Sequence, residues 1–186
     1  MKPFFLPIIP NAPIRKTEQT IEGMLHLKKF GNFGFVQNVA FNEALISFDK
    51  NYQNEQSNSQ VFKQHMDDVY SLLKGNFSEG SKLVEVGCGK GGFLEIVKAD
   101  GHFKYTGYDA AYEGNDERIK ARYLTEKDRL EADVVVMRHS FDYIETPHIF
   151  LKMLRKIFSD NTLIFIEVPQ FEWIENHKVI FDFTYE

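Results

Sequence analysis

The spacing of apolar residues changes near residue 82 and predicts two regions of different character. Downstream of that point, short apolar runs alternate with segments whose apolar residues recur at helical spacing. The runs are typical of buried strands, and the wider spacing is typical of helices. The pattern predicts strands at 83–86, 103–108, 121–124, 132–137 and 162–168, with helices at 91–99 and 147–158.

This alternation of strands and helices predicts the fold class. Such an order usually gives a parallel sheet with right-handed crossovers and helices on both faces. The run 132–137 is apolar at almost every position, which is typical of a strand buried on both faces. We therefore expect an α/β fold with a Rossmann-like, doubly wound and mainly parallel sheet. In such a sheet, ligands bind at the carboxyl ends of the strands.

Upstream of residue 82 the apolar pattern is weaker. A helix at 59–74 has the clearest periodicity, and Gly75 is expected to end it. A modest amphipathic helix is expected at 17–30, although Gly23 weakens it. The predicted apolar face of the first of these helices comprises Val61, Phe62, Met66, Val69, Tyr70 and Leu73.

The remaining upstream segments are interpreted from their composition. Residues 1–14 are rich in proline, which favours an extended segment packed on another surface. Residues 51–58 are polar and are expected to form a loop or lid. We therefore predict two domains. Residues 1–58 form an N-terminal extension and lid, and residues 59–186 form the ligand-binding core.

A glycine loop follows the first predicted strand of the core. Gly87, Gly89 and Gly91 alternate with other residues there. Glycine lets the backbone approach a ligand without a side-chain clash, and the next helix adds unpaired amide donors and a positive dipole end. Cys88 lies inside the loop. We interpret it as a small filling residue rather than a nucleophile, because no paired base is evident.

Two carboxylates flank this loop and indicate the ligand. Glu85 precedes the loop, and Asp109 ends the second strand of the core. A carboxylate here would repel a pyrophosphate but favours a cationic ligand such as S-adenosylmethionine, which carries an ammonium and a sulfonium group. Asp109 can accept hydrogen bonds from both hydroxyls of a ribose. The alternative is a glycine-rich turn and a surface aspartate with no ligand.

The carboxyl ends of the fourth and fifth strands carry the candidates for catalysis. The fourth strand leads into Arg138, His139 and Tyr143, and the fifth leads into Glu167. Methyl transfer requires alignment of the acceptor and, for a hydroxyl or a carbon acid, removal of a proton. Histidine titrates near neutral pH, so His139 suits a general base. Alternatively, His139 is a neutral residue that caps the following turn or contacts the cofactor.

Composition narrows the classes of partner. The 186-residue chain has a formal net charge of −5 and no cluster of Lys and Arg, which argues against a nucleic-acid partner. Its single cysteine excludes an internal disulfide and a zinc site of several cysteines. No apolar stretch approaches the roughly 20 residues of a membrane span, and we recognise no export signal. We expect a cytoplasmic enzyme with a small-molecule substrate and no membrane partner.

The glycine loop and its two acids carry a resemblance to a known family. They resemble the first two motifs of class I S-adenosylmethionine-dependent methyltransferases. The resemblance implies the fold and the cofactor, and it implies nothing about the acceptor. The cofactor-binding residues implied by these motifs are Glu85, Gly87, Cys88, Gly89, Gly91 and Asp109.

A closer resemblance is to the methyltransferases that act on a carbon of nucleotide-linked sugars. It implies methyl transfer to such a carbon, with S-adenosylhomocysteine as the product. It places Tyr52 in the region that closes over the cofactor and makes Glu186 the glutamate of a Glu–His pair in acid/base chemistry. Arg138 joins the cofactor residues, and Tyr143, at the position of a family histidine, joins His139 among the catalytic candidates. The stretches that carry the resemblance are 35–38, 51–59 with His65, 112–114, 137–144 and 166–169.

The sequence departs from this family in two respects. Phe30 and Phe33 occupy the positions of a zinc-binding Cys-x-x-Cys pair, so we expect no metal. The histidine after Glu186, the last two strands and the C-terminal domain of the family have no counterpart. We therefore expect an open edge at the fifth strand, covered by a homodimer or by the N-terminal segment. Two alternatives stay open: a degenerate methyltransferase that binds the cofactor as a non-catalytic partner or sensor module, and a small-molecule O- or N-methyltransferase.

Overall fold

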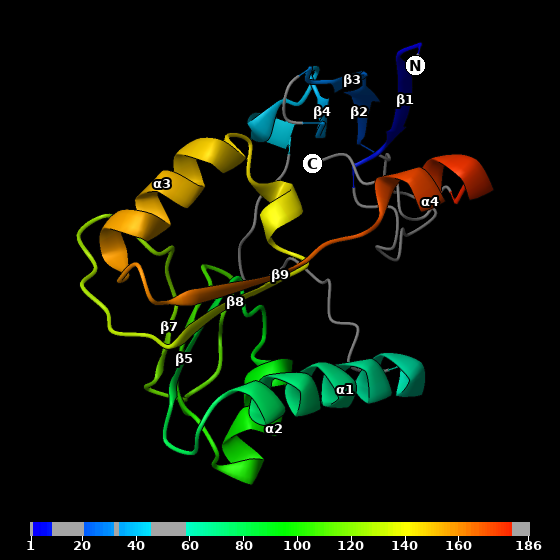
Figure 1. The fold of residues 1–186 in the computed structure, drawn as a ribbon. Coiled ribbons are helices and arrows are strands. Elements are labelled where there is room, and N and C mark those ends of the chain that lie inside the picture. The colour runs from blue at the N-terminus through cyan, green and yellow to red at the C-terminus, as the bar shows by residue number, and fades with distance from the viewer. Residues whose placement is uncertain (1, 9–20, 32–33, 46–58, 180–186) are drawn as a thin grey trace. The chain divides into compact units, whose positions relative to one another are not determined.

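The chain divides into two compact units. The computed structural model describes residues 2–8, 21–31, 34–45 and 59–179. One unit, the sheet unit, spans Phe48–Val168, and the other, the terminal unit, combines Met1–Ser47 with Pro169–Glu186 (Figure 1). The predicted domain boundary after residue 58 stays a prediction.

The sheet unit contains a five-stranded sheet in which every pairing is parallel. The strand order is β7-β6-β5-β8-β9, as expected for a doubly wound fold. The α/β class and the parallel sheet predicted from the sequence are therefore confirmed. The strands are β5 Lys82–Val86, β6 Lys104–Tyr108, β7 Ile119–Lys120, β8 Val134–Arg138 and β9 Leu163–Glu167.

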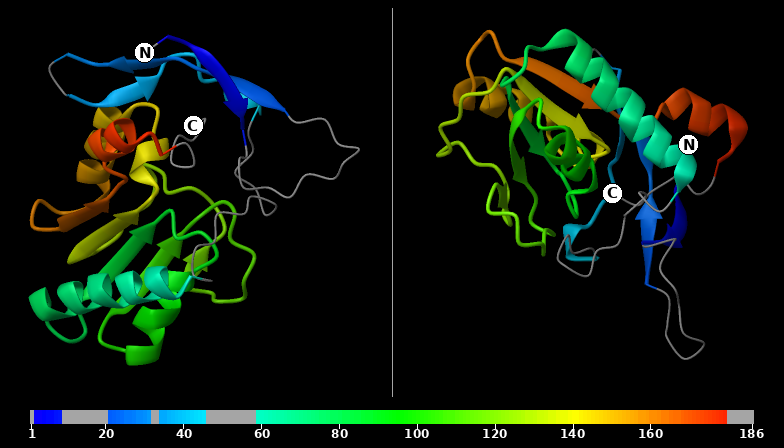
Figure 2. Two further views of the ribbon diagram at one scale, coloured as in Figure 1. Left: turned by 90° about the vertical axis from the view of Figure 1, so that its right-hand side faces the viewer. Right: turned by 90° about the horizontal axis from the view of Figure 1, so that it is seen from below.

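Helices cover both faces of this sheet. Helices α1, Gln60–Asn76, and α2, Gly92–Asp100, lie over one face, and α3, Pro147–Ile157, lies over the other (Figures 1 and 2). Two apolar clusters result, one between the sheet and α1 with α2, and one between the sheet and α3. All five residues of β8 are buried, as its apolar run predicts for a central strand covered on both sides.

Helix α1 differs from its prediction at both ends. The side chain of Ser59 caps its start by accepting the Phe62 amide at 3.4 Å. Val61 is 82% exposed, so it does not belong to the buried face. Gly75 does not end the helix, which continues to Asn76. A glycine in a helix disfavours it by only about 1 kcal/mol, and the Asn76 side chain donates to the Leu72 carbonyl at 2.7 Å, which satisfies one of the final carbonyls.

The strands at the two edges of the sheet also differ from the inner ones. The third strand, β7, lies at 119–120 rather than at 121–124. Among the described strands, β9 pairs with β8 alone. Leu163 is 60% exposed and Ile164 41% exposed on β9, whereas Val135 beside them on β8 is fully buried. The proposed covering of this edge by a second copy stays a prediction.

The terminal unit contains two antiparallel pairs where one helix was predicted. Residues 22–29 are extended, so the predicted helix at 17–30 is wrong over its described part; residues 17–20 lie outside the described residues. Burial alternates along β2, with Gly23 and Leu25 buried, which is a strand period. The elements are β1 Phe4–Pro7 with β2 Glu22–Leu25, β3 Leu27–Lys29 with β4 Val36–Asn38, the 3-10 helix η1 Glu43–Leu45, and α4 Phe171–His177.

A buried asparagine explains why these strands form. The Asn38 amide oxygen accepts the backbone N–H groups of His26, at 2.8 Å, and Ala40, at 3.1 Å, while its nitrogen donates to the Met24 carbonyl at 3.1 Å. These contacts hold β2 and β3 in an extended conformation across a separation of 12 to 14 residues. Local helical spacing in the sequence does not reveal such long-range bonds.

No helix among the described residues is long and apolar enough to cross a membrane.

Candidate functional site

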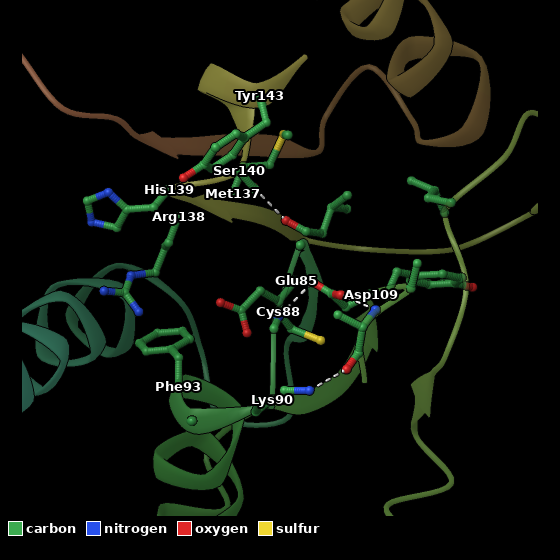
Figure 3. A pocket seen from close by; sticks show the side chains of 18 of the residues that line it. Glu85, Cys88, Lys90, Phe93, Asp109, Met137, Arg138, His139, Ser140 and Tyr143 are labelled. Atoms are coloured by element: carbon green, nitrogen blue, oxygen red, sulfur yellow. Dashed lines mark hydrogen bonds between the residues drawn. The ribbon is translucent and has the colours of Figure 1, made fainter. Parts of the chain in front are cut away.

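A cavity of about 430 Å³ opens at the carboxyl ends of β5, β6 and β8, inside the sheet unit. This is the position where a doubly wound sheet reverses its strand order, with β6 on one side of β5 and β8 on the other. Figure 3 shows Arg138 and His139 on one side of the cavity and Asp109 and Lys90 on the other. Of the predicted site residues, Glu85, Gly87, Cys88, Gly89, Asp109, Arg138, His139 and Tyr143 line it.

The glycine loop after β5 forms one wall. Gly87, Gly89 and Gly91 have φ angles of +78°, +55° and +89°, a region that other residues rarely adopt. A Cβ atom at Gly87 would lie 2.3 Å from the Cβ atom of Ser140, whereas a Cβ atom at Gly89 would meet no atom within 4 Å. Gly87 therefore allows close packing of the loop on the end of β8, and Gly89 leaves its side of the loop open to the cavity. Gly91 does not line the cavity; it is the N-cap residue of α2.

Asp109 joins the end of β6 to this loop. One carboxylate oxygen accepts the Gly89 amide and the other accepts the Ala111 amide, both at 2.7 Å. A carboxylate has about four lone-pair sites, so each oxygen can accept a further bond. The residue that the sequence assigns to a ribose is thus held rigidly at the cavity wall. Its orientation depends on backbone donors of the loop.

The charges on this wall are mixed. Glu85 is 2% exposed and Asp109 is partly buried, and both line the cavity. Lys90 also lines it, but its ammonium donates to the Ala111 carbonyl and to Glu113, each at 3.0 Å. The pairing of Lys90 with Glu113 offsets its positive charge. The two carboxylates therefore give the loop wall its negative character.

Cys88 lies in the same loop and is buried. Burial raises the pKa of its thiol, and the negative charges of Glu85 and Asp109 raise it further. The thiol stays protonated at neutral pH, and a protonated thiol is a poor nucleophile. The position of Cys88 suits a residue that fills the loop.

The opposite wall includes the buried Arg138, which pairs with the partly buried Glu167 just outside the cavity lining. Arg138, at the end of β8, donates from Nε to Glu167 Oε2 at 3.0 Å. Its guanidinium carbon lies 4.8 Å from the ring centre of Phe93 and 5.6 Å from that of Phe62. Among the described residues, its buried Nη2 has no hydrogen-bond partner. Arg138 therefore carries a desolvated donor that no described residue satisfies.

Two histidines share the other oxygen of Glu167. His139 Nε2 and His65 Nε2 each lie 2.8 Å from Oε1. Burial alone would raise the pKa of Glu167, but the hydrogen bonds from His139, His65 and Arg138 outweigh it and hold the pKa well below its ordinary value. Glu167 is therefore ionised at neutral pH. His139 has a φ of 47°, an uncommon conformation for a residue with a side chain.

Only part of this arrangement was expected from the sequence. Glu167 was expected at a strand end but was not paired with His139, and His65 was named only within the family resemblance, without a role. These residues come from α1, β8 and β9, so their meeting depends on the three-dimensional fold. Tyr143, in the 3-10 helix η2 Phe141–Tyr143, lines the cavity as well.

Some predictions fall elsewhere. Tyr52, Phe33 and Glu186 lie outside the described residues. Phe30, at a position where the resembled family has a zinc ligand, stacks on Phe35 with ring centres 5.2 Å apart. Within the described ranges, no group of three His, Cys, Asp or Glu residues is arranged to hold a metal ion.

A comparison with family models identifies the type of domain. Residues 57–181 match the family model described as methyltransferase domain. No curated protein matches the chain significantly. One similar solved structure is the plantazolicin methyltransferase BpumL in complex with SAH, at 21% identity over 52% of this chain and 41% of that chain, with a TM-score of 0.39. Another is BpumL with a monoazolic desmethylPZN analog and SAH, at 20% identity over 56% and 46%, with a TM-score of 0.41. In both, the match spans less than half of BpumL.

Proposed function

The chain belongs to the methyltransferase domain family, and on this premise we propose that it transfers a methyl group from S-adenosylmethionine to a small-molecule acceptor. One observation carries the proposal: an open glycine loop and two carboxylates converge on one cavity. Gly89, Glu85 and Asp109 all line it. Its volume of about 430 Å³ is in the range of small-molecule sites in proteins.

The cavity residues fit this cofactor at both of its ends. The negative loop wall favours a ligand that carries a sulfonium and an ammonium group. The free lone pairs of Asp109 can accept the ribose hydroxyls. On the opposite wall, the buried Nη2 of Arg138 is a donor for the carboxylate of the methionine part, and a charge-assisted bond of this kind is strong. We propose Glu85, Gly87, Gly89, Asp109 and Arg138 as the cofactor-binding residues.

The cofactor supplies an electrophilic methyl group when bound. The residues of this chain hold the acceptor in line with that group, exclude water and remove a proton where the acceptor carries one. His139 is the base candidate that the cavity offers. Tyr143 lines the same cavity and can orient an acceptor through its hydroxyl.

We propose a nucleotide-linked sugar or a related metabolite as the acceptor, with carbon as the methylated atom. The support for this is the resemblance of residues 137–144 and 166–169 to enzymes of that type. A small-molecule O- or N-methyltransferase has the same cofactor wall and differs only in the acceptor. A non-catalytic cofactor-binding module is the second candidate, because Tyr143 stands where the resembled family has a histidine.

Calorimetry and a product assay together test the proposal. Titration with S-adenosylmethionine is expected to give micromolar affinity, about −8 kcal/mol. Release of S-adenosylhomocysteine is then measured over a panel of sugar nucleotides and simple hydroxyl and amine acceptors. Turnover with a sugar nucleotide supports the enzyme, and binding without any turnover supports the binding module. Absence of cofactor binding would refute both.

A further inference from the structure

Three side chains, two from the end of β8 and one from α1, converge on one carboxylate beside the cavity. Arg138 of β8 pairs with Oε2 of Glu167. Oε1 of the same carboxylate binds two histidines, His139 just after β8 and His65 of α1. One ion pair between Arg138 and Glu167 would be enough to tie β8 to β9. The two histidines therefore need a separate explanation.

His139 is fixed to Glu167 twice. Its backbone N–H donates to the Glu167 carbonyl at 2.9 Å, and its ring nitrogen Nε2 lies 2.8 Å from the carboxylate of the same residue. The positive φ of His139 is a disfavoured backbone conformation that persists only where the surroundings impose it. Such strained residues concentrate at functional sites. Since His139 also lines the cavity, a cavity residue is held in place against its local backbone preference.

This geometry selects one tautomer of the ring. An ionised carboxylate only accepts hydrogen bonds, so Nε2 must carry the hydrogen that it shares with Glu167. In the neutral ring the basic lone pair is then on Nδ1. A carboxylate in this position also stabilises the imidazolium that forms when Nδ1 takes a proton. The other charged groups around the ring are Arg138 on β8, His65 on α1 and Asp142 in η2, whose charge interacts with that of His139.

We propose that Glu167 is a positioning residue that holds His139 in the Nε2–H tautomer, so that Nδ1 deprotonates the methyl acceptor. This inference rests on the proposed function and narrows its substrate class. The acceptor is one that must lose a proton on methylation, such as a hydroxyl or an activated carbon acid. An acceptor that is already a good nucleophile, such as a thiolate, has no use for such a base.

The step balances without any further reactant. The acceptor X–H loses its proton to Nδ1 of His139, and its electron pair forms the X–CH₃ bond. The S–CH₃ bond breaks, and its electrons neutralise the sulfonium to give the thioether product. The imidazolium formed beside Glu167 afterwards loses its proton to solvent.

The histidine tautomers can be measured directly by long-range ¹H–¹⁵N correlation spectra of the full chain at neutral pH. The chain has six histidines, and the His139→Asn variant assigns the signal of His139 by its loss. Asparagine is chosen because it tolerates positive φ. The wild-type ring is expected as the Nε2–H tautomer. A dominant Nδ1–H tautomer would overturn the proposal.

The Glu167→Gln variant tests the positioning role. Glutamine keeps the shape but loses the charge, and the His139 ring is expected to shift toward a mixture of tautomers. Glu95→Gln on α2 is the matched control, because Glu95 is exposed and forms its ion pair with Lys98. It is expected to leave the spectrum unchanged. An unchanged His139 signal in folded Glu167→Gln would also overturn the proposal. If that variant does not fold, the tautomer of His139 in the wild type still tests the proposal.

Kinetics and calorimetry separate this inference from the proposed function. For any hydroxyl or carbon acceptor that turns over, His139→Asn is expected to lower kcat by about 10² to 10⁴, with KM changed far less. A folded His139→Asn variant with an unchanged kcat would contradict the role of His139 as the base. Cofactor binding by the wild type, combined with the wrong tautomer, refutes only the inference. Loss of wild-type cofactor binding refutes the proposed function itself.

Discussion

The two walls of the cavity are built in different ways. The loop wall depends on backbone: Gly87 and Gly89, both with positive φ, and the Gly89 and Ala111 amides that bind Asp109. The opposite wall, which we call the carboxylate wall, depends on side chains: Arg138 and His139 line the cavity and bind Glu167, which lies outside the lining and also binds His65. The backbone of the loop wall defines the shape of the site. The side chains of the carboxylate wall define its charges and histidine tautomers, so the state of each side chain depends on the others in the cluster.

The sharpest way to break the loop wall is Gly87→Ala. The new methyl group would lie 2.3 Å from the Cβ atom of Ser140, and the φ of +78° is unfavourable for alanine. Backbone strain and overpacking each disfavour the fold by about 1 to 3 kcal/mol, so we expect about 2 to 6 kcal/mol of lost stability. Urea unfolding measures it. Gly80→Ala is the control, because Gly80 has a φ of +83° and no atom within 4 Å of its Cβ position. An equal loss in both variants would contradict the role of close packing.

Arg138→Met breaks the carboxylate wall. Removing one partner of a buried ion pair leaves an uncompensated charge and typically lowers stability by about 3 to 5 kcal/mol. The side chain of Glu167 is 15% exposed and keeps both histidines, so we expect about 2 to 4 kcal/mol. The same urea titration measures it. Arg155→Met is the control, since the ion pair of Arg155 with Asp160 is exposed on both sides. If Arg138→Met lowers the free energy of unfolding no more than the control does, then the ion pair with Arg138 does not stabilise the fold.

Asp109→Ala tests cofactor binding at the loop wall rather than the stability of the fold. Loss of two hydrogen bonds to the ribose is expected to weaken S-adenosylmethionine binding by about 1.5 to 3 kcal/mol. Calorimetry measures the change, with Asp67→Ala on the exposed face of α1 as a charge-matched control. Unchanged affinity in Asp109→Ala would remove this residue from the site.

The smallest effect is a dependence of stability on pH. Because the pKa of Glu167 is lowered in the folded state, its contribution to stability is complete above its ordinary pKa, near 4.5, and is lost as the pH falls through the lowered value. The stability difference between wild type and Glu167→Gln should therefore be constant above about pH 5 and shrink below it. Urea titrations of both proteins across this range measure the difference. A difference that grows toward low pH would contradict the direction of the shift.

The loop wall could be predicted from the sequence, and the carboxylate wall largely could not. Gly87, Gly89 and Cys88 are contiguous, and Asp109 follows one strand later, so spacing alone places them together. His65 and Glu167 are 102 residues apart, and only the packing of α1 beside β9 joins them. Local patterns carry no information about that contact.

The fold shows the same division. From residue 82 onward, the apolar runs predict the inner strands correctly. The residues of each inner strand are consecutive in the sequence and are buried together, so the run itself marks the strand. The short β7 was misplaced, since two residues make too little pattern to locate. The strands β2 and β3 were mistaken for a helix because Asn38, 12 residues beyond His26, supplies the bond that holds them extended.

The burial of Cys88 gives the cavity a built-in chemical reporter. It is the only cysteine in the chain, so a maleimide or iodoacetamide adduct can form at one thiol alone. The thiol lines the cavity and is buried and protonated, so its alkylation depends on access to the cavity. The labelling rate is thus a measure of that access, read from intact mass without any acceptor substrate. A ligand that closes on the glycine loop would slow that rate, which makes this thiol a means of screening cofactor analogues.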